Sequence, residues 1–193
     1  MVLAVLVFFV LFFLLQAFPD VLDGVLSKKQ KEVKRAKLGA DAEVQVDVLL
    51  DNLSGDYYVL NDLVSPYGNI DHAVISKNGC LFLIETKSHH GKVVIENNTL
   101  YLNGHLTEKD FIAQTLKNAY WLRDRITEIV GIKVWVYPII VFTNAFVPFT
   151  NPVKGIKVIN QKYLLTTIKN INSQGLASHI LWDKRDSIVS ILK

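Results

Sequence analysis

The stretch IDHAVISKNGCLFLIETK, residues 70–87, decides the fold. Two apolar, strand-like runs flank the residues Lys77-Asn78-Gly79, and this arrangement is a strong signal for a β-hairpin. If these three residues form the loop, with Gly79 in the left-handed conformation, Ser76 faces Cys80. The same register places Asp71 opposite Glu85. We therefore expect a hairpin whose register is set by its turn.

Side chains alternate between the two faces of a strand, so this register assigns each hairpin residue to a face. The first face is apolar along its length and ends in two carboxylates and an ammonium group: Asp71, Ala73, Ile75, Leu81, Leu83, Glu85 and Lys87. The second face carries Ile70, Val74, Phe82 and Ile84. Because both faces are apolar, we expect the hairpin to be central and buried.

The charged end of the first face is the candidate site. Two facing carboxylates in a buried setting stay ionised only with a cation between them. A divalent ion such as Mg²⁺, or Mn²⁺ in its place, suits this role because it takes carboxylates and keeps waters. Lys87 could orient or deprotonate an attacking water, or neutralise charge that builds up on a phosphate. The alternative from spacing alone is a structural ion pair between Lys87 and Asp71 or Glu85.

Outward from the hairpin, the pattern of apolar residues predicts helices and strands that alternate along the chain. Helices are expected at 38–56, 108–129, 163–171 and 184–192, and strands at 57–60, 93–95, 99–102, 133–142 and 157–159. This order predicts an α/β fold with one central mixed sheet flanked by helices. About 150 residues are enough for one good core.

The first eighteen residues, MVLAVLVFFVLFFLLQAF, are apolar on every helical face and are followed by Pro19, which we expect to end the helix. A run of this length just reaches the minimum for a membrane span. We expect an uncleaved N-terminal transmembrane helix at residues 1–18; a cleaved signal or a buried core helix are the alternatives. The basic cluster at residues 28–37 would then stay on the cytoplasmic side. The expected localisation is the cell membrane, with a single pass and the soluble domain in the cytoplasm.

Charge is distributed unevenly. Residues 28–37 hold six basic side chains and one acidic one, and the two aspartates of residues 1–27 leave residues 38–193 with no net charge. A neutral domain does not indicate nucleic-acid binding by its bulk charge. A basic face can still lie within a neutral total, and Lys117, Arg123 and Arg125 on the long helix are the candidates.

Several short motifs occur in order and together resemble a known family. They are Gly39 to Glu43, Tyr58 to Leu63, Ile70 to Ile75, Asn78-Gly79, Ile84 to Lys87, Gly91 and Gln114. The combination resembles the NERD domain, the nuclease-related domain, which is similar to the PD-(D/E)xK nuclease superfamily. The resemblance covers residues 38–150 and implies a restriction-endonuclease-like sheet flanked by helices. Residues 19–37 would then be a basic juxtamembrane linker, and 151–193 would complete the domain.

The resemblance also implies a role for each matching residue. Asp71 and Glu85 would be metal ligands, with Glu43 as an additional carboxylate from the first helix of the domain. Lys87 would be the catalytic lysine, and Gln114 would orient Lys87 or the phosphate. The implied activity is Mg²⁺- or Mn²⁺-dependent hydrolysis of nucleic acid, with DNA favoured over RNA.

Two other functions stay open at this point. One is a catalytically weak module that binds nucleic acid or protein at the membrane. The other is a membrane-anchored interaction domain whose ion pair is structural. Among the remaining candidates, His72 is expected to pack on the face opposite Asp71. Trp121 and Trp135 fit core positions better than a base-stacking platform.

Overall fold

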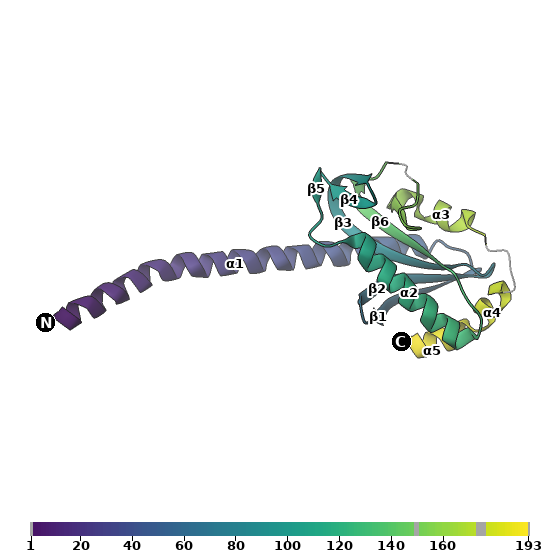
Figure 1. The fold of residues 1–193 in the computed structure, drawn as a ribbon, viewed down its shortest axis with the longest axis horizontal. Helices are drawn as coiled ribbons and strands as arrows, with labels where there is room; N and C mark the ends of the chain where they lie inside the picture. The colour runs from purple at the N-terminus through teal and green to yellow at the C-terminus, as the bar shows by residue number, and fades with distance from the viewer. Residues whose placement is uncertain (1, 149–150, 173–176, 193) are drawn as a thin grey trace. The chain divides into compact units, whose positions relative to one another are not determined.

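The computed structural model describes residues 2–148, 151–172 and 177–192, with side chains described at 22–148, 151–172 and 179–192. The chain divides into two units, Met1–Ala40 and Asp41–Lys193. The first unit consists of the greater part of helix α1 (Val2–Leu50). The second unit holds the last turns of α1, all seven named strands and the remaining helices (Figure 1).

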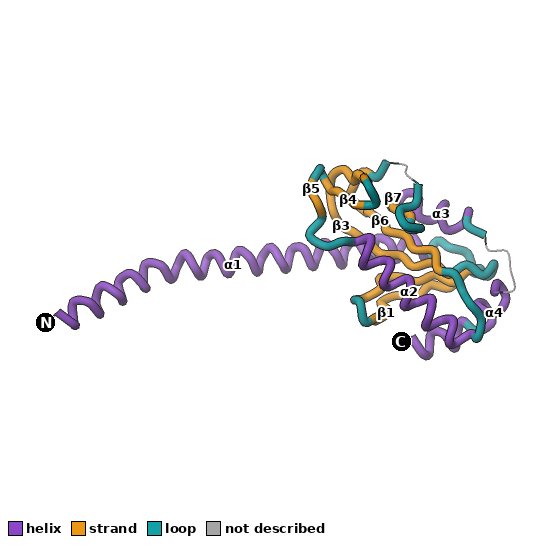
Figure 2. The backbone as a smooth tube through the Cα atoms, in the orientation of Figure 1, coloured by secondary structure: helices purple, strands orange, loops and turns teal. Residues whose placement is uncertain are grey.

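The second unit is an α/β domain with a mixed sheet, as expected (Figure 2). The strands are β1 (Tyr57–Ser65), β2 (Gly68–Ser76), β3 (Leu81–Glu96), β4 (Thr99–Leu102), β5 (His105–Leu106), β6 (Val136–Phe146) and β7 (Lys157–Asn160). Strands β1, β2 and β3 pair antiparallel, and β6 pairs parallel with β3 and with β7. The far half of β3 forms an antiparallel branch with β4 and β5. Strand β3 is therefore the strand on which the sheet is centred.

The central hairpin has the register that its turn predicts. His72 pairs with Ile84 and Ile75 with Leu81, and the N–H of Ser76 donates to the carbonyl of Cys80 at 2.9 Å. Gly79 has φ +83°, the left-handed conformation that the three-residue loop requires. The prediction of the register is confirmed, because a short turn with one obligatory glycine leaves few alternatives.

The predicted assignment of faces is wrong for Ile70. This side chain lies in the same core cluster as Ala73, although strict alternation would separate them. The ladder between β1 and β2 omits one pair, Asp62 opposite Asp71, and Asp62 has φ +55°. The left-handed residue interrupts the pleat of β1, and Leu60 and Leu63 on either side of it both face that cluster. Alternation therefore fails at Asp71, where the candidate site begins.

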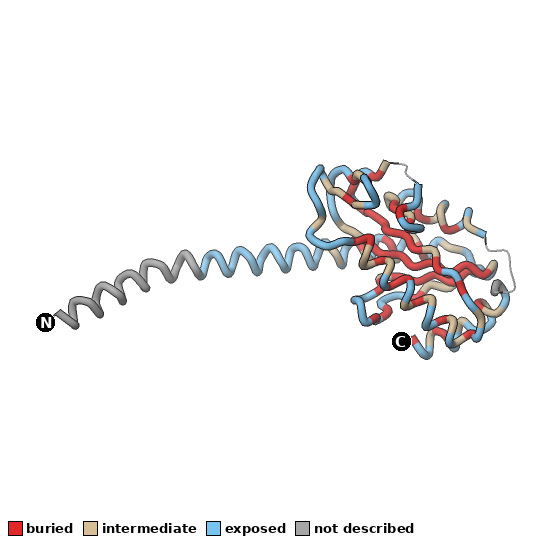
Figure 3. Tube along the Cα trace, viewed as in Figure 1, coloured by how far each residue is buried: buried red, intermediate tan, exposed pale blue. Residues whose placement is uncertain are grey.

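Helices cover both faces of the sheet. Helix α2 (Phe111–Val130) packs with α4 (Ala177–Asp183) and α5 (Arg185–Leu192) against one face, and Leu122 and Ile126 are fully buried there. The last turns of α1 and helix α3 (Leu164–Asn170), which follows the short 3-10 helix η1 (Gln161–Tyr163), pack against the other face. Buried residues run along the strands between these layers (Figure 3).

Helix α1 differs from the expectation. Its backbone is helical from Val2 to Leu50 without interruption, whereas the sequence suggested an end at Pro19 and a second helix at 38–56. A proline within a helix costs about 3 kcal/mol. The Lys-, Glu- and Ala-rich residues that follow it favour helix strongly. The helix that was expected to reach residue 56 ends six residues earlier, in a turn before β1.

The expected membrane anchor is not tested by the described side chains. Within the residues whose side chains are described, no helix is long and apolar enough to cross a membrane. The anchor expected at residues 1–18 lies outside those residues.

The prediction of core positions for the two tryptophans is wrong for Trp135, which is 64% exposed. Trp121 packs only partly against the core.

Candidate active site

Glu85 and Lys87 form a direct pair near the middle of β3. The ammonium nitrogen of Lys87 donates to Oε1 of Glu85 at 2.6 Å, and the two side chains are only 12% and 4% exposed. Their i, i+2 spacing places both on one face of the strand, as predicted. The other carboxylate oxygen of Glu85, Oε2, is buried and has no hydrogen-bond partner among the described residues.

Asp71 joins this pair from the neighbouring strand. Its Oδ2 accepts a hydrogen bond of 2.6 Å from the backbone N–H of Thr86, the residue between the paired glutamate and lysine. The β2–β3 ladder stops one pair before Asp71 would meet Glu85, so the carboxyl is free to turn toward the backbone. Burial and then the charge of Glu85 raise the pKa of Asp71 to about 7, although the Thr86 N–H and Lys87 act in the opposite direction.

An aromatic ring supports the lysine. Nζ of Lys87 lies 4.7 Å from the centre of the Phe111 ring, within the range of a cation–π interaction. Phe111 is the first residue of α2, and Asp110 caps the helix by accepting from the N–H of Ala113 at 2.9 Å. The cap fixes where the helix begins and so places the ring beneath the ammonium group. Sequence reasoning missed Phe111, because only the tertiary fold brings α2 to β3.

Glu43 contributes a further carboxylate from α1. Burial raises its pKa, and the charges of Asp62, Glu85 and Asp47 raise it further. The charge of Glu85 acts on Glu43, and this supports the predicted position of Glu43 beside the candidate site. Its role as a metal ligand stays a prediction.

A buried histidine holds the end of α1 against the sheet. His72 is 1% exposed, and its Nε2 lies 2.8 Å from Oδ1 of Asp47 on α1. Burial lowers the pKa of this imidazole even though Asp47 favours the charged form. His72 is buried on the α1 side, as expected, but it also fixes the helix one turn from Glu43.

Asp62 is a site residue that sequence reasoning did not select. It is exposed on β1, and it lies opposite Asp71 at the one pair that the β1–β2 ladder omits. Its charge raises the pKa of Glu43. The available signal was the Asn61-Asp62 pair within a strand, since asparagine and aspartate tolerate positive φ better than other non-glycine residues.

Gln114 lies on α2, half-buried, beside the turn between β1 and β2. A Cβ added to Gly68 would lie 3.4 Å from its amide nitrogen Nε2, so the two residues are in close contact. The structure thus places Gln114 next to the start of β2. Its expected role in orienting Lys87 or a phosphate stays a prediction.

The donor set suits a divalent cation held by few protein ligands. No group of three or more His, Cys, Asp and Glu side chains within the described residues is placed to hold a metal ion. Mg²⁺ commonly uses one or two carboxylates and keeps several waters. The partnerless Oε2 of Glu85 and the raised pKa of Asp71 are both features that a cation would relieve. Asp71 and Glu85 therefore fit such an ion.

Fold and site together define the class: a mixed-sheet α/β domain whose central hairpin ends in a largely buried cluster of two carboxylates and a lysine. The profile of the nuclease-related domain, NERD, matches residues 38–143, just over half of the 193 residues. The chain belongs to this nuclease-related family. The matched range contains Glu43, Asp71, Glu85, Lys87 and Gln114. Comparison with curated proteins and with solved structures gave no match.

Proposed function

We propose that this protein is a membrane-anchored nuclease that hydrolyses phosphodiester bonds of DNA with a divalent metal ion. The observation that carries the proposal is the buried Glu85–Lys87 pair with Asp71 bonded to the intervening backbone. Two carboxylates and one ammonium group converge there on adjacent strands. A purely structural ion pair would not need a second, partly protonated carboxyl beside it.

Lys87 is the residue we assign to the developing charge. Its ammonium group is held by Glu85 on one side and by the Phe111 ring on another, so little reorganisation is needed when substrate arrives. It would donate to a non-bridging oxygen of the scissile phosphate or to the attacking water. Water then forms the new bond to phosphorus and releases a proton to the solvent, the ester bond to the leaving oxygen breaks, and that oxygen takes up a proton from the solvent.

Asp71 and Glu85 are the residues we assign to the metal, with Mg²⁺ or Mn²⁺ as the expected ion. Such an ion acts as a Lewis acid on the phosphate and lowers the pKa of bound water. Glu43 adds negative charge from α1 and is proposed as an additional carboxylate of the site. We expect Gln114 to position substrate from α2.

The proposal is tested by incubating the full-length chain in non-ionic detergent with supercoiled plasmid in Mg²⁺, Mn²⁺ or EDTA. We expect nicking with either metal and none in EDTA, and loss of nicking in Glu85→Gln. Glu96→Gln is the matched control, because Glu96 lies exposed on the same strand. Binding of nucleic acid without cleavage in either metal would favour the alternative, a binding module that retains the fold.

Membrane anchoring is proposed from the sequence of residues 1–18 and the basic cluster at 28–37. A short apolar helix followed by lysines and arginines is oriented with the basic residues in the cytoplasm. We expect the expressed chain to remain in the membrane pellet after an alkaline carbonate wash and to be released by detergent. Release by the wash alone would contradict the anchor while leaving the nuclease proposal intact.

A further inference from the structure

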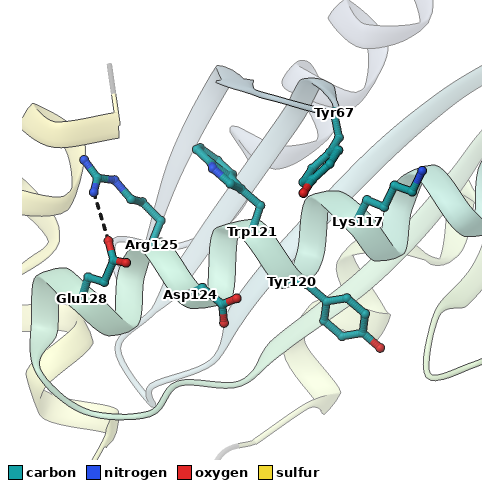
Figure 4. A pocket seen from close by; sticks show the side chains of 7 residues that line it. All are labelled: Tyr67, Lys117, Tyr120, Trp121, Asp124, Arg125 and Glu128. Carbon is teal, nitrogen blue, oxygen red and sulfur yellow. Dashed lines mark hydrogen bonds and ion pairs between the residues drawn. The ribbon is translucent and has the colours of Figure 1, made fainter.

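A hollow of about 460 Å³ lies along α2 (Figure 4), and none of the residues that line it belongs to the carboxylate cluster. Its lining combines three aromatic side chains with two cations and two carboxylates: Tyr67, Tyr120, Trp121, Lys117, Arg125, Asp124 and Glu128. Tyr67 and Tyr120 are 51% and 53% exposed, so both rings are open to a binding partner. This aromatic groove is not used by the chemistry assigned above.

Tyr67 reaches the groove because the turn between β1 and β2 is fixed to α2. Oγ of Ser65 donates to Oδ1 of buried Asn118 at 2.7 Å and accepts from the N–H of Tyr67 at 3.0 Å. The amide of Asn118 in turn donates to the carbonyl of Asn69 at 3.4 Å. Gly68 has φ +113° and contacts Gln114, a candidate site residue. The turn therefore connects the aromatic groove to the candidate active site.

Cations alternate with the indole along one side of α2. Lys117, Trp121 and Arg125 recur every four residues, and Figure 4 shows their side chains along one side of the helix with the Tyr67 ring beside Trp121. The two cations are thus separated by about 12 Å along the helix.

The acidic residues of the groove are neutralised by arginines. Arg125 bonds Glu128 at 3.0 Å and Arg123 bonds Asp124 at 2.7 Å. The guanidinium of Arg123 also lies 5.0 Å from the centre of the Tyr120 ring. Exposed pairs of this kind are weak, so a phosphate can take the place of either carboxylate.

We propose that the aromatic groove binds unpaired bases of single-stranded nucleic acid next to the active site. This inference deepens the proposed function, on which it rests, by naming the form of the substrate. Exposed rings offer stacking surfaces to any base, and Lys117 and Arg125 offer charge to the flanking phosphates. Bases within a duplex are already stacked and could not use the rings.

The absence of net charge on residues 38–193 also favours a single strand over duplex DNA as the ligand. Proteins that hold duplex DNA through its backbone make many phosphate contacts and lose affinity steeply as salt rises. A groove with two or three cations would instead bind through stacking, with a shallow dependence on salt. For a single strand we expect a slope of log affinity against log salt of about −2 or shallower.

The test measures binding of a fluorescent twelve-residue oligothymidylate and a duplex of equal length to the full-length chain in EDTA, so that cleavage does not intervene. We expect the single strand to bind more tightly than the duplex. Tyr67→Ala and Tyr120→Ala should each weaken single-strand binding about five-fold to 100-fold, the range for loss of one stacked base. The control is Tyr163→Ala, an equally exposed tyrosine (49%) with Lys162 over its ring, which lies outside the groove.

A second readout uses tryptophan fluorescence. Stacking on Trp121 should quench part of the emission, and Trp121→Leu should abolish that part although Trp135 and Trp182 remain. Unchanged single-strand affinity in both tyrosine variants would overturn the proposal. So would equal affinity for the single strand and the duplex.

The outcomes separate this proposal from the proposed function. If the protein binds single strands through the groove but never cleaves with either metal, the nuclease proposal fails and the groove assignment stands. If it cleaves, while the tyrosine variants bind and cleave single strands as the unaltered chain does, the groove assignment fails alone.

Discussion

Replacement of Asp71 by asparagine should stabilise the metal-free protein, and more so at high pH. Asparagine keeps an oxygen that can accept from the Thr86 N–H but carries no charge. The pKa of Asp71 is raised from 3.8 to about 7 in the folded chain, chiefly by burial and by Glu85. The folded state therefore holds a proton that the unfolded state releases. Stability from this group is lost as the pH rises from about 4 to 7.

The magnitude follows from the same shift. Each unit of difference in pKa corresponds to about 1.4 kcal/mol, so between pH 5 and pH 8 the ionisation of Asp71 destabilises the fold by about 2–3 kcal/mol. We expect the stabilising effect of Asp71→Asn to be larger at pH 8 than at pH 5 by an amount of this order. Burial also lowers the pKa of His72, but this residue is present in both proteins and is common to the comparison.

The assay is urea unfolding of both proteins in EDTA at pH 5 and pH 8, followed by tryptophan fluorescence. Addition of Mg²⁺ at pH 8 should stabilise the unaltered chain and leave Asp71→Asn nearly unchanged, because an ion that binds only the folded state shifts the equilibrium toward it. A variant that is less stable than the unaltered chain at pH 8 in EDTA would refute the reasoning. So would a difference between the two proteins that does not vary with pH.

Two other substitutions test the surroundings of the site. Phe111→Leu should slow cleavage about three- to thirty-fold, because the cation–π interaction beneath Lys87 is lost; rates are compared after the melting curve confirms folding, and an unchanged rate would exclude the ring from the site. Gly91→Ala should lower the stability by about 2 kcal/mol or more, since Gly91 has φ +109° and the new Cβ would collide with the amide of Asn103. A melting temperature equal to that of the unaltered chain would contradict that geometry.

Short stretches of this sequence predict several features of the fold and of the site. The glycine of the Lys77-Asn78-Gly79 loop and the apolar alternation around it predict the central register. The strands expected at 93–95 and 99–102 also pair, across a turn in which Asn97 and Asn98 have positive φ. The i, i+2 spacing of Glu85 and Lys87 predicts their shared face because it depends on one strand only. These features need no knowledge of the rest of the fold.

Features that depend on two distant segments escaped prediction. The break in alternation at Asp71 arises from the left-handed Asp62 in the neighbouring strand, and the support of Lys87 comes from Phe111 on a helix that follows later in the chain. Helix α1 continues through Pro19, contrary to the expectation, because the helix-forming residues that follow outweigh the cost of one proline.

The central claim is that Lys87 acts on the scissile phosphate. It is tested most directly by the single-turnover rate of plasmid nicking with Mg²⁺ for Lys87→Ala and for Lys77→Ala. Lys77 lies in the turn of the same hairpin, is 62% exposed and pairs with Asp56 at 3.3 Å, so it controls for loss of a lysine. We predict that Lys77→Ala cleaves like the unaltered chain and that Lys87→Ala is slower by about 100-fold or more. Equal rates for the two variants would contradict the account.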